Sequence, residues 1–413
     1  MTPLWSSEVE ARIRAETRSL DTQIRPNEVK YCVRCVVSNQ RPRIIFDDEG
    51  VCSACRFAER KKSGIDWKAR EEELAALLAK HRRKSGHDVI VPSSGGKDSA
   101  FVAHTLKTKY GMNPLCVKWA PFIYTDIGRK NFDAFIQSGF DCLVAYPNGL
   151  IHRKLARLAF EFLGDAFQPF AFGQLNYPMH MAKRFDIPLV FFGENGEAEY
   201  GGDPSANDKP CWDYKDWERV YLKGNGIDAL LNMGVSLGAF TQEEISRVSE
   251  FYRLPTALAF DNEISIIGAR NLEFHWLGYY MKWHPQRNYY LACENTGFQA
   301  NPDGRSEGTY SKYASLDDKT DGFHYFMSYI KFGLGRATSD AAHEIRDGDR
   351  ARDEGVSLVK RYDGEFPRKH FGEFLEYLGM SESHFWRVVD RYRPEHLWEQ
   401  ANGTWNLKHG IPE

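Results

Sequence analysis

The chain lacks several features that would place it in a specialised class. It has 413 residues, and no apolar run approaches the length needed to cross a bilayer. Its first residues lack the basic region and apolar core of a signal peptide, so we expect a cytoplasmic protein without membrane insertion. The formal net charge is only -3, which gives no electrostatic reason to expect nucleic acid as the main partner. We find no internal repeats or low-complexity tracts, and the length predicts two or three domains.

Cysteine is too scarce for a disulfide scaffold, at eight residues in the whole chain. Four of them nevertheless form two C-x2-C pairs, with sixteen residues between the pairs: Cys32, Cys35, Cys52 and Cys55. This spacing is typical of a tetrathiolate zinc site. We expect a closed, structural zinc that ties together Tyr31 to Phe57, a segment too small to bury its own core. An iron–sulfur cluster and four unliganded thiols are the alternatives.

A Walker A motif is also missing, yet one stretch has the residue types of a phosphate-binding turn. This stretch, VPSSGGKDSA, covers Val91 to Ala100. It follows the strand-like run Asp88 to Val91 and precedes Phe101 to Leu106, whose pattern is typical of a helix. The sequence therefore predicts a turn from a strand into a helix.

Such a turn can bind an anion. The first N–H groups of a helix have no intrahelical partner, and the helix dipole adds partial positive charge. Gly95 and Gly96 let a ligand approach the backbone closely, while Ser94, Lys97 and Ser99 add donors. The alternative is that Ser94 or Ser99 only caps the helix.

The middle of the chain alternates between strand-like and helical patterns. The strand-like runs are Val89 to Val91, Pro114 to Trp119, Cys142 to Ala145 and Pro188 to Phe192. This alternation predicts an α/β fold with a doubly wound, mostly parallel sheet. Ligands of such sheets bind at the carboxyl ends of the strands, where the glycine-rich turn lies.

We divide the chain into five parts. Residues 1–30 are an N-terminal extension, and 31–60 are the tetracysteine zinc segment. Residues 61–85 are a connecting helix, because Asp66 to Lys80 consists of strong helix formers. Residues 86–225 form the α/β domain, and 226–413 form a mainly helical region for substrate or partner binding.

A second unusual stretch, GENGEAEYGG, follows the last of the four strand-like runs. It covers Gly193 to Gly202 and carries Glu194, Asn195, Glu197 and Glu199. Acidic side chains at a sheet edge that faces a phosphate loop are natural partners of magnesium or of an amine nucleophile. A plain glycine-rich surface loop is the alternative.

The helical region contains one stretch, Tyr310 to Arg346, that mixes aromatic and charged residues densely. Part of it predicts an amphipathic helix with a core stripe of Phe326, Tyr329 and Ile330. Three cationic groups amid apolar neighbours could hold an anionic substrate: His324, Lys331 and Arg336.

Near the end, Phe371 to Leu397 is typical of a helical hairpin around Gly379 to Ser381. Its acidic residues favour a hairpin that packs against the rest of the protein over a DNA-binding helix-turn-helix.

With the SGGKDS turn after a strand, the chain resembles the PP-loop ATP pyrophosphatase superfamily. The tetracysteine segment, the Gly193 to Gly202 stretch and the Tyr310 to Arg346 stretch make it similar to the N-acetyl sugar amidotransferases of surface-polysaccharide biosynthesis, from about Tyr31 onward. The resemblance implies that the chain adenylylates the acetamido oxygen of a nucleotide-linked N-acetyl sugar. Ammonia then replaces that oxygen, giving an acetamidino sugar, AMP and pyrophosphate.

The resemblance also implies site residues. Those matching the pyrophosphate loop are Ser94, Gly95, Gly96, Lys97, Asp98 and Ser99. Lys118 to Ala120 match the place where the superfamily lines its adenine pocket, and Glu194 and Asn195 match the motif at the mouth of the site. We expect Lys97, Asp98, Glu194 and Glu197 to be catalytic, and Asn195 to bind substrate.

The implied cofactors are ATP, Mg²⁺ and a structural Zn²⁺. The chain has no glutaminase signature, so the resemblance implies a separate glutaminase subunit with a barrel-fold companion, similar to those of imidazole glycerol phosphate synthase. The alternative in the same superfamily is a tRNA-thiolating enzyme. A non-catalytic nucleotide-binding scaffold is the alternative from another class.

Overall fold

The computed structural model describes residues 4–212, 214–220, 226–255 and 272–412. Its centre is a five-stranded sheet in the order β3-β2-β1-β4-β5, and every pairing between neighbours is parallel. The strands are β1 (Val89–Pro92), β2 (Pro114–Trp119), β3 (Asp141–Ala145), β4 (Leu189–Phe192) and β5 (Glu273–Trp276). The predicted α/β class with a parallel sheet is therefore confirmed.

Helices cover both faces of this sheet because its central strands are apolar on both sides. Val89 and Val91 face one core, built with α3 (Trp67–His81), α4 (Lys97–His104), α5 (Asp126–Gln137) and α14 (Pro285–Thr296). Ile90 faces the other core, built with α6 (Gly149–Leu163), α7 (Gln168–Arg184) and α10 (Gly226–Leu237). The turn from β1 into α4 lies at the carboxyl end of the central strand.

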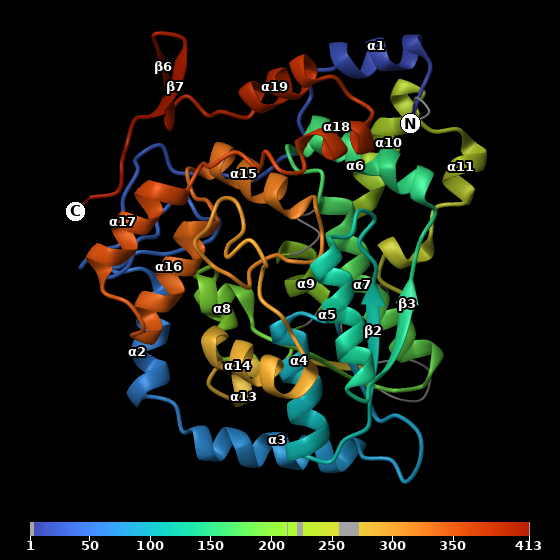
Figure 1. The fold of residues 1–413 in the computed structure, drawn as a ribbon, viewed down its shortest axis with the longest axis vertical. Helices are drawn as coiled ribbons and strands as arrows, with labels where there is room; N and C mark the ends of the chain where they lie inside the picture. Colours follow the sequence, from blue (N-terminus) through green and yellow to red (C-terminus); the bar gives the residue numbers. More distant parts are fainter. Residues whose placement is uncertain (1–3, 213, 221–225, 256–271, 413) are drawn as a thin grey trace.

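The remaining elements are mostly short helices. They are α1 (Ser7–Ala15), α2 (Ser53–Ser63), a π-helical turn (Thr105–Lys109), α8 (Gly196–Tyr200), a 3₁₀ turn (Pro204–Ala206), α9 (Tyr214–Val220), α11 (Gln242–Ser246), a 3₁₀ turn (Glu250–Tyr252), α13 (Leu277–Tyr280), α15 (Asp321–Phe332), α16 (Arg336–Asp347), α17 (Arg352–Tyr362), α18 (Phe371–Leu378), α19 (Glu382–Arg391) and the antiparallel pair β6 (Trp398–Ala401) and β7 (Thr404–Leu407). Figure 1 shows α3 along one edge of the molecule and α15 to α19 gathered away from it.

The C-terminal helices pack as the sequence predicts. α15 buries Phe326 and Ile330, while Tyr329 is partly buried. The predicted hairpin is α18 and α19, and Gly379 ends α18 in the left-handed conformation, with φ +60°. The predicted strands and the connecting helix are also confirmed within about one residue.

The sheet extends beyond the predicted α/β domain in sequence. Its edge strand β5 lies after residue 225 and pairs with β4 along its whole length, from Leu189 opposite Glu273 to Phe192 opposite Trp276. β5 is not predicted from the sequence, because EFHW is short and carries no β-branched residue. The division of the chain into five parts stays a prediction.

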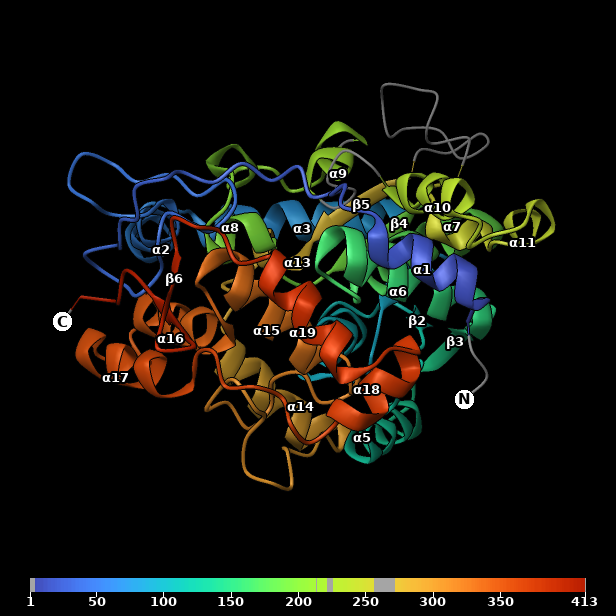
Figure 2. The same cartoon turned by 90° about the horizontal axis from the view of Figure 1, so that it is seen from above.

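The tetracysteine segment shares a core with α16 and α17. Val36 and Val51 pack in one cluster with Leu334, Ala341 and Val356. In Figure 2, α2 lies on the same side of the molecule as α16 and α17. This arrangement agrees with the expectation that the segment is too small to bury a core of its own. Among the described residues, none of the helices is long and apolar enough to cross a membrane.

Candidate nucleotide site and metal centre

The glycine-rich turn has a geometry that its glycines make possible. Gly95 has φ +85°, and a Cβ atom there would lie 2.7 Å from the Cα atom of Phe132 in α5. The Gly96 N–H donates to Ser94 Oγ at 3.1 Å, and Ser99 Oγ donates to the Gly96 carbonyl at 3.1 Å. No side chain in the described ranges caps α4, so the capping alternative is wrong. The start of α4 is therefore open to an anion.

Two charged side chains follow the glycines. Lys97 is 8 % exposed, and its Nζ lies 2.5 Å from Asp98 Oδ2. The other carboxylate oxygen, Asp98 Oδ1, accepts a hydrogen bond of 3.0 Å from Asn288 Nδ2. Asn288 is a buried residue of α14, so a distant segment holds the loop carboxylate in place.

Two cavities meet at this turn. The strand-end cavity, of about 280 Å³, is lined by the ends of β1, β2, β4 and β5. Its polar lining includes Ser94, Asp98, Ser99, Lys118, Glu194 and Asp317. The loop cavity, of about 140 Å³, is lined by Ser94 to Asp98 together with Tyr313 and Asp317. Because Ser94, Asp98 and Asp317 line both cavities, one extended ligand could occupy them together.

Lys118 joins the end of β2 to the glycine-rich turn. It is 2 % exposed, and its Nζ donates to the Ser94 carbonyl at 2.7 Å. The ammonium also lies 4.0 Å from the centre of the Phe132 ring. Burial lowers the pKa of Lys118. A buried cation on the cavity wall favours an anionic ligand.

Glu194 lies at the end of β4 and lines the strand-end cavity. Burial and the neighbouring Asp98 carboxylate raise the pKa of Glu194 to about 7, although Lys97 opposes this shift. Its Oε1 accepts a hydrogen bond of 3.3 Å from Tyr200 Oη. A carboxyl group with such a pKa can take or give a proton near neutral pH.

The other polar residues of the GENGEAEYGG stretch are turned into the protein. Asn195 Oδ1 accepts from the Glu197 N–H at 3.1 Å, and Asn195 Nδ2 donates to the Ala206 carbonyl at 3.1 Å. Glu197 forms a two-point ion pair with Arg43, at 2.8 and 2.7 Å. Glu199 pairs with Lys61 at 2.6 Å. The stretch is therefore a buried junction rather than a surface loop, and catalytic or substrate roles for Asn195 and Glu197 stay predictions.

The three cationic residues predicted to bind substrate lie in different surroundings. His324 Nδ1 lies 3.0 Å from Asp165, and Lys331 Nζ lies 3.0 Å from Asp21. Neither side chain lines the strand-end or loop cavity. Arg336 is closer to the turn, because it lines a small cavity together with Lys97 and Tyr200.

Arg336 also lines a larger cavity of about 450 Å³ in the C-terminal region. It donates from Nη1 to Tyr325 Oη at 2.9 Å. Of the three predicted cations, it is therefore the one that the structure places next to the glycine-rich turn.

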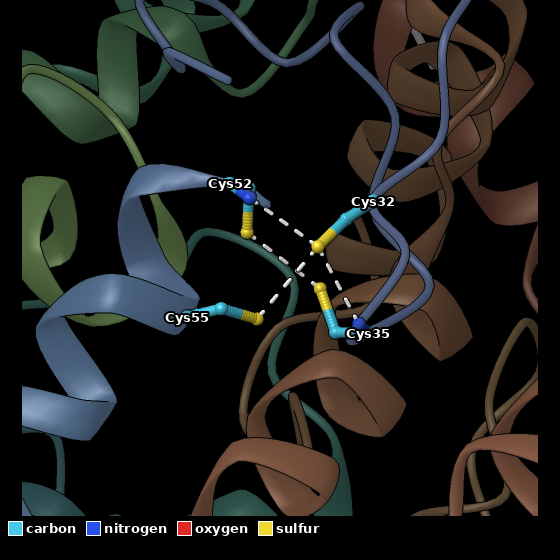
Figure 3. A group of neighbouring side chains, drawn as sticks. All are labelled: Cys32, Cys35, Cys52 and Cys55. Carbon is cyan, nitrogen blue, oxygen red and sulfur yellow. Dashed lines mark hydrogen bonds between the residues drawn. The ribbon is translucent and has the colours of Figure 1, made fainter. Parts of the chain in front are cut away.

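The four cysteines form a buried cluster that could hold a metal ion, called the metal centre below. Cys32 and Cys35 lie on a loop, Cys52 and Cys55 lie at the start of α2, and their sulfur atoms point toward one another (Figure 3). The Sγ atoms of Cys32 and Cys55 are 3.8 Å apart, and those of Cys35 and Cys52 are 3.7 Å apart. Tetrahedral thiolates at about 2.3 Å from zinc would lie about 3.8 Å from one another. The buried centre is thus compatible with one structural zinc ion.

Sequence reasoning missed Asn288 and Asp317. Asn288 meets Asp98 across 190 positions of the chain. Asp317 reaches the cavities because its segment pairs with the residues after β2, through an isolated bridge between Tyr124 and Asp318. The signal for Asp317 is weak, since SLDDKTD has the composition of a solvated loop.

Part of the C-terminal region is similar to a known protein family. Residues 307–411, about a quarter of the chain, match the family model described as "LPS biosynthesis protein WbpG-like, C-terminal domain". A search of curated proteins found no match. The matched region contains Asp317, Arg336 and the helices α15 to α19. This similarity supports placing the chain among polysaccharide-biosynthesis proteins.

Proposed function

We propose that this protein is an ATP-dependent, AMP-forming amidotransferase of the PP-loop type that acts on a nucleotide-linked N-acetyl sugar. It would work in the cytoplasm, in the biosynthesis of a surface glycan. One observation carries the proposal: the glycine-rich turn, Glu194 and Asp317 line one cavity at the carboxyl ends of parallel strands. Asp317 belongs to the region that is similar to a lipopolysaccharide-biosynthesis domain.

ATP would lie across the two cavities. The start of α4 and the side chains of Lys97 and Ser99 would bind the β,γ-pyrophosphate, and Lys118 and Trp119 would line the adenosine side. The acetamido oxygen would attack the α-phosphorus, so that pyrophosphate leaves and an O-adenylyl imidate forms. The donors around the turn favour this step because they face the charge that builds on pyrophosphate.

A magnesium ion would be held at this position by phosphate oxygens of ATP together with Asp98 or Asp317, whose carboxylates line the strand-end cavity. Within the described part of the chain, Asp98, Glu194 and Asp317 do not form a cluster of three close metal ligands, so the phosphate groups would supply most of the coordination. A bound magnesium ion would neutralise phosphate charge during the attack.

Glu194 is the candidate proton acceptor for the second step. Ammonia attacks the imidate carbon, the new nitrogen loses a proton, and AMP leaves with the former acetamido oxygen. A pKa of about 7 lets Glu194 accept that proton at neutral pH and release it afterwards. The product is an amidine, which is cationic near neutral pH.

The nitrogen would come from a separate glutaminase subunit with its barrel-fold companion. Two of the four cysteines outside the metal centre, Cys116 and Cys142, are poor nucleophiles, because burial raises the pKa of each thiol to about 12.

The test is to incubate the purified chain with ATP, Mg²⁺, ammonium at alkaline pH and a diacetamido nucleotide sugar. The proposal expects AMP, pyrophosphate and an amidine product. Sulfur transfer to a tRNA fraction would support the thiolating alternative instead. ATP binding without AMP formation, with sugar and ammonia present, would support the scaffold alternative.

A further inference from the structure

The tetracysteine segment contacts α8, the short helix that follows Glu194, through several charged side chains. Arg43, in the loop between the two cysteine pairs, makes the two-point ion pair with Glu197, whose side chain is 6 % exposed. Lys61, in the helix that carries Cys52 and Cys55, pairs with Glu199, whose side chain is 3 % exposed. Arg41 Nε donates to the Gly201 carbonyl at 2.6 Å. Two cations of the tetracysteine segment, Arg41 and Arg43, and one cation of the α2 helix that begins in it, Lys61, therefore hold one turn of helix.

The packing around this helix leaves little room for movement. Gly201 has φ +83°, and a Cβ atom there would lie 3.0 Å from Ile44 and 3.1 Å from Ala54, both in the tetracysteine segment. A Cβ atom at Gly202 would lie 2.2 Å from the Glu197 carboxylate. The two glycines thus allow the segment and its ion pairs to close on α8.

A side chain from α16 joins the metal centre to the same helix. Arg346 donates from Nη2 to the Glu199 carbonyl at 2.8 Å and from Nη1 to Cys35 Sγ at 3.8 Å. His343, one turn earlier in α16, lies 3.1 Å from Glu199 Oε2. The position of a cysteine sulfur and the position of α8 are therefore linked through one guanidinium group.

α8 in turn restrains both the backbone and the side chain of Glu194. The helix begins directly after Asn195, which caps it, and Tyr200 in its last turn donates to Glu194 Oε1. Any shift of α8 would move both the backbone next to Glu194 and its hydrogen-bond donor. Glu194 faces the strand-end cavity, whereas Glu197 and Glu199 face the tetracysteine segment.

We infer that Arg43 and Lys61 are positioning residues: through Glu197 and Glu199, the tetracysteine segment and the α2 helix that begins in it set where Glu194 lies in the cavity. The metal centre thereby contributes to the reaction as well as to folding. The kinetic part of this inference rests on the proposed function, but the mechanical part, that Arg43 restrains α8, does not.

A pair of matched variants tests the inference. Arg43→Met removes the guanidinium that reaches α8, while Arg56→Met removes one from the same segment that pairs only within it, with Asp47, Glu49 and Glu59. Each purified full-length variant is measured for zinc content, for amide hydrogen exchange in residues 194–203, and for the pH dependence of amidine formation.

We expect both variants to keep one zinc ion per chain. Arg43→Met should exchange the amides of 194–203 at least about tenfold faster than the native protein, because it frees a locally held turn. It should also lower kcat for amidine formation about tenfold to a hundredfold, because Glu194 would be misplaced. The inflection near pH 7 in the pH dependence of the rate, the pH limb, should shift as well. Arg43→Lys should recover part of both effects, and Arg56→Met should match the native protein in all three readings.

Equal exchange in Arg43→Met and Arg56→Met would overturn the inference, and so would loss of zinc from Arg43→Met, since Arg43 would then act on the metal centre. If the native protein forms no amidine, the proposed function fails, while the exchange measurement still decides whether Arg43 restrains α8. Faster exchange with an unchanged kcat and pH limb would refute the link to Glu194.

Discussion

Replacing Lys61 with methionine should destabilise the protein far more than the loss of an ordinary surface charge. The Lys61 and Glu199 side chains are only 8 % and 3 % exposed, and their charged atoms lie 2.6 Å apart. Removing one partner of such a pair leaves the other charge buried, which costs about 3–5 kcal/mol. An unfolding entropy of about 2.1 cal/mol/K per residue converts this loss into a fall in melting temperature of about 3–6 °C for a chain of this length.

The assay is thermal unfolding followed by circular dichroism between pH 6 and 8. Burial alone would raise the pKa of Glu199, but Lys61 and His343 lower it to about 2. A carboxyl group with a lowered folded-state pKa stabilises the fold above its unfolded pKa of about 4.3 and loses that effect as the pH falls toward 2. Across pH 6–8 the native pair should therefore contribute its full stabilisation, and Lys61→Met should unfold at a lower temperature than the native protein throughout this range.

Two further variants separate the pair from the packing around it. Lys68→Met removes an exposed lysine 3.9 Å from Glu72, and it should change the free energy of unfolding by less than about 0.5 kcal/mol. The double variant Lys61→Met with Glu199→Gln removes both charges and should recover at least half of the loss. If Lys61→Met is no more harmful than Lys68→Met, the assignment of a tight buried pair is wrong.

The remaining predictions concern the metal centre and the cavity. Cys32→Ser should lose zinc and solubility, as shown by metal analysis, because the segment relies on the ion to fold; loss of zinc with an intact fold would contradict this role. Lys97→Ala and Ser99→Ala should each lower the rate of AMP formation about 10²–10³-fold while leaving circular dichroism unchanged, since each removes a donor to pyrophosphate; near-normal turnover would refute the site. Glu194→Gln should impair the ammonia step more than adenylylation and remove the pH limb near 7, because the raised pKa belongs to that carboxyl group; a limb that persists would exclude Glu194 as the proton acceptor.

Local patterns in the sequence were enough to predict four of the five strands of the sheet and the turn after β1, but not the edge strand β5. Val89 to Val91 is apolar on both faces, which is typical of a central parallel strand, and Gly95 after it has a positive φ and a close neighbour in Phe132. The cysteine spacing likewise predicted the buried cluster of four cysteines, because two C-x2-C pairs are typical of a tetrathiolate site. These features depend on residues near one another in the chain.

The parts that sequence reasoning missed depend on contacts between distant segments. Glu197 lies in an acidic, glycine-rich stretch of the kind found at active sites. In the fold, however, it pairs with Arg43, which is 154 positions away in the chain. Asp317 reaches the cavity through a bridge after β2, and Asn288 reaches Asp98 from α14. No local periodicity distinguishes a buried ion pair from a catalytic carboxylate, so the predicted roles of these acids could not be ranked before the fold was known.

The central claim is that this chain replaces an amide oxygen by nitrogen at the expense of ATP. The most direct measurement is mass spectrometry of a diacetamido nucleotide sugar after incubation with the purified chain, ATP, Mg²⁺ and ¹⁵N-ammonium at alkaline pH. We predict that the sugar gains one ¹⁵N atom as a cationic amidine, in step with the AMP released, and that glutamine gives no product until the glutaminase and its barrel-fold companion are added. An unlabelled sugar, or ADP in place of AMP, would contradict the account.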